Sequence, residues 1–336
     1  MLYVGLDVHK RFWSCCVLDE RLRKRAAVVL PGEVDALVRF LEHLGERYSI
    51  CFEASSQYGY LYDRLRPHAE RVAVAHPAHV RLIYRSKRKN DRLDAQKLAK
   101  LLAIGAIPMV HVPSGEIRAL RSAVVARERL VGECTRCKNA IRALLEANGI
   151  RPPKRLWSKQ GRRWLADVEL AHELYAERRD LLLEALEQAM ARLKRLERSL
   201  NKRSGRLPAV ALLRTIPGVG VRTAEALVAF IADPRRFTSN KTIGSYFGLV
   251  PKEDSSGGCQ RLGHITKNGP SVVRRLLNQA AWQAIRRSPQ LRSFYEKIRR
   301  GKKERRKIAI VATMHRLARV ALAMLRSGEA WRWQEA

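Results

Sequence analysis

A chain of 336 residues is long enough for two domains with separate hydrophobic cores. Its apolar content of 46% excludes a disordered basic tail, and its net charge of +34 makes a polyanion, above all nucleic acid, the leading partner. The excess of positive charge is unevenly distributed along the chain. Residues 1–110 hold 19 Lys or Arg and 12 Asp or Glu, whereas residues 111–336 hold 47 Lys or Arg and 20 Asp or Glu. Charge alone leaves open a ribosome-associated or membrane-surface protein.

The cysteines and the apolar segments indicate a cellular compartment. Six cysteines show no framework spacing, and we interpret Cys134 and Cys137 as structural residues rather than zinc ligands. Asp7 interrupts the apolar start, so no signal peptide is expected, and the absence of an 18-residue apolar run predicts no membrane partner. We expect a protein of the reducing prokaryotic cytoplasm, associated with the nucleoid.

Residues 1–110 predict an α/β domain, because strands come first and then alternate with helices. The expected strands are 2–8, 13–18, 25–30, 48–53 and 71–75. The expected helices are 33–47, 58–68, 77–84 and a last one that carries Asp91 and Asp94 to about residue 103. A basic stretch, Ser86–Lys89, precedes this last helix.

Residues 111–205 predict a long coiled-coil hairpin, formed by helices at 114–148 and 160–202. The second helix has a heptad seam of Leu182, Leu186, Ala189, Leu193, Leu196 and Leu200. The segment 149–153 breaks the chain between the two helices with a glycine and two prolines. Such a hairpin would space two domains or form a dimer.

Residues 206–336 predict a mostly helical third region. Ile216–Gly220 is typical of a helix-hairpin-helix turn that points backbone N–H groups at a DNA phosphate, although similar turns also serve only in packing. A glycine-rich segment follows at 255–263, and a final helix is expected at about 304–326.

Four acids in the first region predict a divalent-metal site. Asp7 and Glu53 each end a strand, and Asp91 and Asp94 are three residues apart on one helix face. Four converging carboxylates would repel each other unless cations lay between them, and two Mg²⁺ ions can clamp both oxygens of a phosphodiester. Each acid alone could be an ordinary surface residue or cap. We interpret His9 as a strand-end residue rather than a ligand.

The motif Ser255-Ser256-Gly257-Gly258 places a serine on an unobstructed backbone. A hydroxyl in this position could attack a large substrate, although the motif alone is most often just a loop. Basic side chains around it and farther along the chain are expected to bind nucleic acid without reading its sequence. These candidates are Arg222, Arg261, Lys267, Arg274, Arg275, Arg299, Arg300, Lys302 and Lys303.

Taken together, the motifs resemble those of the DEDD insertion-sequence transposases, a group guided by a bridge RNA that includes the Piv-type DNA invertases. The matching motifs are Gly5–Lys10, Phe52–Ser55, Asn90–Ala95, Thr215–Gly220 and Ser255–Gly258. They stand in the family's order and cover roughly residues 2–105 and 208–326. One departure is Asn90, which stands where the family commonly has Thr.

This resemblance implies an N-terminal RuvC-like domain of the ribonuclease-H type, in which Asp7, Glu53, Asp91 and Asp94 bind Mg²⁺. It also implies a C-terminal serine that forms a transient phosphoserine link to DNA, by motif position Ser256, with Ser255 beside it as the alternative. The partners implied are donor and target DNA, a structured noncoding guide RNA and further copies of the chain, as a dimer or as a tetramer of two dimers. The tetrad and the serine of one site are expected to come from different subunits.

Two other functions remain open on the sequence. A metal-dependent junction resolvase or nuclease would use water as its nucleophile, and an architectural nucleic-acid-binding protein would perform no chemistry. The clustered acids argue against the architectural protein, because acids weaken phosphate binding unless a metal is present.

Overall fold

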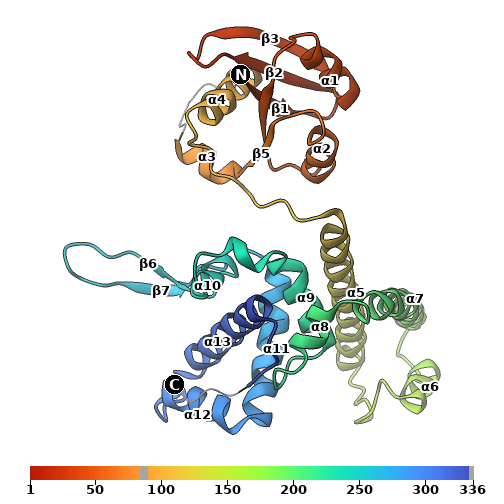
Figure 1. The fold of residues 1–336 in the computed structure, drawn as a ribbon. Coiled ribbons are helices and arrows are strands. Elements are labelled where there is room, and N and C mark those ends of the chain that lie inside the picture. Colours follow the sequence, from red (N-terminus) through yellow and green to blue (C-terminus); the bar gives the residue numbers. More distant parts are fainter. Residues whose placement is uncertain (84–89, 333–336) are drawn as a thin grey trace. The chain divides into compact units, whose positions relative to one another are not determined.

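The computed structural model describes residues 1–83 and 90–332, and it divides into two compact units, residues 1–115 and 116–336. The predicted basic stretch Ser86–Lys89 lies outside the described residues. The first unit contains the predicted sheet domain, and the second contains the spacer and C-terminal regions, both of them mostly helical (Figure 1).

The first unit is a mixed five-stranded sheet between two layers of helices (Figure 1). Its strands lie in the order β3-β2-β1-β4-β5, with β1 antiparallel to β2 and parallel to β4. The strands are β1 (Leu2–Val8), β2 (Phe12–Leu18), β3 (Lys24–Pro31), β4 (Tyr48–Glu53) and β5 (Arg71–Ala75). The helices are α1 (Val34–Glu42), α2 (Tyr58–Leu65), α3 (Pro77–Ile83) and α4 (Asp91–Ala103).

The alternation of side chains along β1 explains the two helical layers. Leu2, Val4 and Leu6 are buried against α1 and α2, whereas Tyr3 belongs to the opposite cluster with α3 and α4. All five predicted strands are confirmed, and their ends lie within a residue or two of the predicted ends. Helix α1 ends earlier than predicted, because Gly45 adopts φ +65° just beyond it and turns the chain away.

The second unit begins with three helices, α5 (Gly115–Ala147), α6 (Lys159–Asp167) and α7 (Glu173–Ser204). The predicted single helix over 160–202 is wrong, because the chain is extended at Val168 and His172 caps a new helix by accepting from the Leu174 N–H at 3.1 Å. The predicted heptad seam is shared between two cores. Leu186 and Ala189 pack with α5 and α6, whereas Leu200 joins the C-terminal core, so the coiled-coil hairpin stays a prediction.

The rest of the unit is a helical core that carries one small hairpin (Figure 1). Its strands are β6 (Pro251–Glu253) and β7 (Leu262–Ile265), which pair with each other in a two-stranded sheet. Its helices are α8 (Pro208–Leu213), α9 (Val221–Ile231), the short 3₁₀ turn Pro234–Arg236, α10 (Thr242–Tyr246), α11 (Ser271–Arg287), α12 (Pro289–Arg299) and α13 (Arg306–Ser327).

Helix α13 is long and apolar enough to cross a membrane by length and composition, and half of its most apolar window is buried. Ala309, Met314 and Leu322 pack in the middle of the C-terminal core. Its apolar character is therefore explained by burial within the unit.

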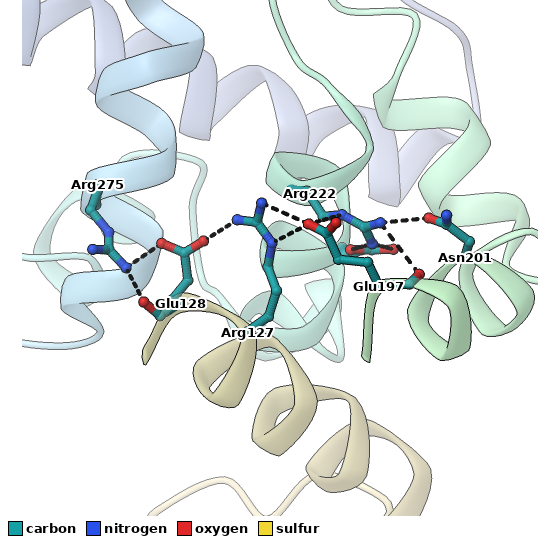
Figure 2. A network of polar contacts seen from close by, with 7 residues as sticks. Arg127, Glu128, Glu197, Asn201, Arg222 and Arg275 are labelled. Atoms are coloured by element: carbon teal, nitrogen blue, oxygen red, sulfur yellow. Dashed lines mark hydrogen bonds and ion pairs between the residues drawn. The ribbon is translucent and has the colours of Figure 1, made fainter. Parts of the chain in front are cut away.

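A network of charges that includes the buried Glu128 and Glu225 joins α5, α7, α9 and α11 (Figure 2). Arg127 donates to Glu197 at 2.9 Å and also pairs with Glu128, which Arg275 contacts from α11. Arg222 donates to both carboxylate oxygens of Glu225 at 2.9 Å and to Asn201 at 2.6 Å. Each acid that is removed from water therefore has a cationic partner.

Candidate active site

Two of the predicted acids lie at the carboxyl ends of neighbouring parallel strands. Leu6 of β1 is paired with Phe52 of β4, and Asp7 and Glu53 are the next residue of each strand. Leu6 and Phe52 are buried on the face covered by α1 and α2. Because side chains alternate along a strand, Asp7 and Glu53 belong to the opposite face, where α4 packs.

The other two acids occupy the first turn of α4. Asn90 caps this helix, since its side-chain oxygen accepts from the Arg92 N–H at 3.1 Å. Asp91 and Asp94 follow in the turn where negative side chains are favoured by the helix dipole. The cap explains the departure at Asn90, because asparagine and threonine both serve as N-caps.

Gly5 allows α4 to approach the sheet closely enough for the acids to meet. A Cβ atom on Gly5 would lie 1.9 Å from the carbonyl oxygen of Ala95 and 2.5 Å from the amide nitrogen of Ala99. Any side chain on Gly5 would therefore push α4 away from β1. The glycine acts two residues before Asp7 and sets the distance between the strand and Asp91.

His9 lies between two of the acids. Its Nε2 atom is 3.1 Å from Asp7 Oδ2 and 3.2 Å from Asp91 Oδ2. The buried Trp13 fixes this turn by donating its indole N–H to the His9 carbonyl oxygen at 3.1 Å. The placement runs against the interpretation of His9 as a plain strand-end residue. The spacing between His9 and Asp7 could have indicated this position, since residues two apart at a strand end share a face.

Asp7, His9 and Asp91 together form a group able to hold a cation. One ligand atom of each lies within 4.8 Å of the others, and all three residues are half-buried. Burial raises the pKa of the Asp7 carboxyl above its ordinary value, His9 opposes this rise, and the charges of Asp91 and Asp94 add to it. Among the described residues, Glu53 and Asp94 do not belong to this group. The Asp94 carboxylate instead accepts a hydrogen bond from the Lys97 ammonium group at 2.7 Å.

The serine pair lies at the exposed tip of the β6–β7 hairpin, in the other unit. Ser255 Oγ donates to Glu253 at 2.8 Å and accepts from the Arg261 N–H at 3.2 Å, so this hydroxyl shapes the loop. Ser256 pairs through its backbone with Cys259, whose N–H donates to the Ser256 carbonyl oxygen at 3.0 Å. Its own side chain is exposed and makes no hydrogen bond with another described residue.

The two glycines after Ser256 close the turn. Gly257 and Gly258 adopt φ angles of +56° and +79°, which favour glycine, and nothing lies within 4 Å of where their Cβ atoms would be. Residues 251–264 are all exposed. The segment Ser255–Gly258 therefore forms the turn at the tip of a hairpin, where Ser256 is accessible to a large substrate.

Two family comparisons match both units. Residues 4–149 match the DEDD transposase family of IS110-type elements, described as "Transposase", and residues 210–296 match "Transposase IS116/IS110/IS902 family". The chain belongs to the IS110/IS116/IS902 transposase family. The acids, the cap at Asn90 and the serine hairpin all lie within the matched segments.

Individual relatives of this transposase include inverting proteins as well as insertion-sequence proteins. The chain is 29% identical to the Sinorhizobium fredii protein y4qE over 83% of its length and 71% of the relative. It is 26% identical to "Transposase for insertion sequence element IS1111A" of Coxiella burnetii, over 84% of this chain and 78% of the relative. It is 31% identical to the "Pilin gene-inverting protein" of Moraxella lacunata, over 34% of this chain and 36% of the relative.

Three of the basic residues predicted to bind nucleic acid make polar contacts within the second unit of this transposase. Arg222 is 17% exposed and belongs to the charge network. Arg274 donates to the carbonyl oxygens of Asn268 and Gly269 at 2.9 and 3.0 Å, and desolvation lowers its pKa. Arg275 pairs with Glu128 but stays 45% exposed. Their contacts favour a structural role for Arg222 and Arg274.

The other predicted basic residues lie at the surface. Arg299 is half-buried in a pair with Glu296 at 3.1 Å, and the rest are exposed. These exposed residues are Arg261, Lys267, Arg300, Lys302 and Lys303. The helix-hairpin-helix-like turn also serves in packing, since a Cβ on Gly218 would lie 2.4 Å from the Ala284 amide nitrogen of α11.

Proposed function

We propose that this transposase cuts and rejoins DNA strands, with the acids of the first unit and the hydroxyl of Ser256 as the two halves of its active site. The observation that carries the proposal is the convergence of Asp7, His9 and Asp91 at the edge of the sheet. A mixed sheet with acids at the ends of β1 and β4 supports a RuvC-like domain of the ribonuclease-H type.

We assign Asp7, Glu53, Asp91 and Asp94 as the ligands of a divalent cation, and two of them, Asp7 and Asp91, belong to the group of three residues described above. Burial together with the neighbouring carboxylates disfavours the charged form of Asp7, and a bound cation would relieve this cost. Carboxylate oxygens are the ligands that Mg²⁺ prefers. When bound, Mg²⁺ would neutralise charge on the reacting phosphate. His9 would orient Asp7 and Asp91 through its Nε2 atom.

Ser256 would act as the nucleophile. Its Oγ atom forms a bond to phosphorus while the bond from phosphorus to the departing sugar oxygen breaks, and the serine proton passes to that oxygen through solvent. The phosphoserine ester keeps the energy of the broken phosphodiester, so the reverse attack by a sugar hydroxyl rejoins strands without ATP. Ser255 is the weaker candidate, because its hydroxyl is engaged with Glu253 and Arg261.

Donor and target DNA are the proposed substrates, and a structured noncoding RNA is the proposed guide. Specificity carried by base pairing requires only backbone contacts from the protein, which its net charge of +34 can supply. We also propose a dimer or a tetramer of two dimers, in which the tetrad and Ser256 of one site come from different subunits.

Trapping a covalent intermediate tests the proposal. A DNA substrate nicked so that the cut end diffuses away should leave a protein–DNA adduct that mass spectrometry maps to Ser256. Ser256→Ala should form no adduct and exchange no strands, whereas Ser255→Ala should still form it. Full strand cleavage by Ser256→Ala would contradict the proposal and favour a nuclease that uses water. Strand exchange unaffected by Asp7→Ala would contradict the metal site.

A further inference from the structure

A groove between α5 and α11 carries basic side chains that neither the serine hairpin nor the acid cluster uses. Its volume is about 670 Å³. Residues of α5 that share one helix face line one wall, and the first turns of α11 line the other. The lining residues are Val125, Glu128, Arg129, Gly132, Glu133, Arg136, Ser271, Val272 and Arg275.

The charges in this groove leave arginines free for a ligand. Glu128 is buried and is neutralised from both sides by Arg127 and Arg275 (Figure 2). Arg129 and Arg136 are exposed, and neither forms an ion pair with a described acid. Glu133 is the remaining lining acid, so the two free arginines outweigh it.

Gly132 opens the floor of the groove. A glycine inside a helix costs roughly 1 kcal/mol relative to alanine, so its presence in the middle of α5 calls for a reason. The position where its Cβ would be lies 3.4 Å from a guanidinium nitrogen of Arg136. A larger side chain on Gly132 would fill the space between Arg129 and Arg136.

The spacing of the free arginines fits a polymer. Arg129 and Arg136 are seven residues apart, which is roughly 10 Å along the helix axis and the rise of about three nucleotides in one strand of a duplex. A guanidinium binds phosphate through a planar fork of donors. Two such groups in line along a groove can therefore hold successive parts of one backbone.

We propose that this groove binds the sugar–phosphate backbone of a nucleic acid strand, with Arg129 and Arg136 on its phosphates and the strand running over Gly132. The groove belongs to the same unit as Ser256, and only five residues separate β7 from α11. The site would hold the strand without reading its sequence.

Binding by the full chain tests the groove separately from catalysis, because Ser256→Ala can serve as the background for every variant. Fluorescence anisotropy with single-stranded DNA, single-stranded RNA and duplex DNA as probes would give affinity as a function of salt. In R129A/R136A, the slope of log K against log salt should become shallower by about 1.8 for a duplex or about 1.4 for a single strand. The probe that shows this change identifies the strand that the groove holds.

Two further variants separate shape from charge. Gly132→Leu fills the floor without changing the charge and should weaken binding several-fold. Thr135→Leu, an exposed position on the same helix outside the groove, should bind as the parent does. R195A/R198A on α7 removes two exposed positive charges elsewhere and should change the slope less.

The proposal is overturned if Gly132→Leu binds all three probes with the parent's affinity while its thermal unfolding is unchanged. It is also overturned if R195A/R198A flattens the salt dependence as much as R129A/R136A does. Loss of the covalent adduct at Ser256 has no bearing on either result, so the groove and the proposed reaction can fail independently.

Discussion

At the scale of single residues, the burial of Asp7 disfavours the charged form that its proposed role as a metal ligand requires. Burial and the charges of Asp91 and Asp94 raise its pKa, so the folded chain binds this proton more tightly than the unfolded chain does. The stability contributed by this group therefore falls as the pH rises above the unfolded value of 3.8, and the loss persists at neutral pH.

Asp7→Asn should therefore raise the melting temperature at pH 7 in metal-free buffer. The gain should shrink as the pH falls towards 4, where Asp7 of the parent chain takes up its proton. Thermal unfolding followed by circular dichroism across this range measures both effects. Glu33→Gln removes one exposed negative charge as a control. A variant less stable than the parent at pH 7 without metal would contradict the prediction.

At the scale of elements, the contact between β1 and α4 depends on a missing side chain. Gly5→Ala should displace α4 and cost roughly 3 kcal/mol of unfolding free energy, the upper end for overpacking, because the new methyl group meets backbone atoms. It should also weaken Mn²⁺ binding, measured by calorimetry, by moving Asp91 away from Asp7. Gly263→Ala is the control, since its Cβ would lie 3.8 Å from its neighbours. Unchanged metal affinity would contradict this account.

The charge network gives a second prediction for packed helices. Arg222→Ala leaves Glu225 of α9 fully buried without its partner, which should cost about 3–5 kcal/mol in urea unfolding. Arg299→Ala breaks the partly exposed pair with Glu296 and should cost at most about 1 kcal/mol. Equal losses in the two variants would show that the network contributes no more than a surface pair.

The sequence predicted elements better than contacts. The four acids were predicted because strand and helix periods place them on shared faces, and the approach of Asp91 to Asp7 depends on Gly5, whose packing partner Ala95 comes ninety residues later. His9 was set aside because its spacing fits no metal motif, yet Asp91 reaches it from a distant helix. Arg222 looked like a phosphate ligand, because sequence reports charge but not the buried carboxylate of Glu225.

At the scale of the whole molecule, the two halves of the proposed site belong to separate compact units joined after Gly115. Mixing Asp7→Ala and Ser256→Ala chains should restore strand exchange if one site takes its acids and its serine from different subunits. Random assembly of dimers would leave about a quarter of the sites intact. Strand exchange assays on each variant alone and on the mixture decide this, and a mixture as inactive as its components would contradict shared sites.

The hairpin that presents Ser256 also carries an exposed thiol that can be labelled. Cys259 lies across the turn from Ser256 and is exposed, whereas the other five cysteines are buried or half-buried. Burial raises the pKa of Cys15 and of Cys51 to about 12, which keeps both thiols protonated and unreactive. A maleimide dye should therefore label Cys259 selectively. Its fluorescence would report in real time when the tip of the hairpin reaches DNA.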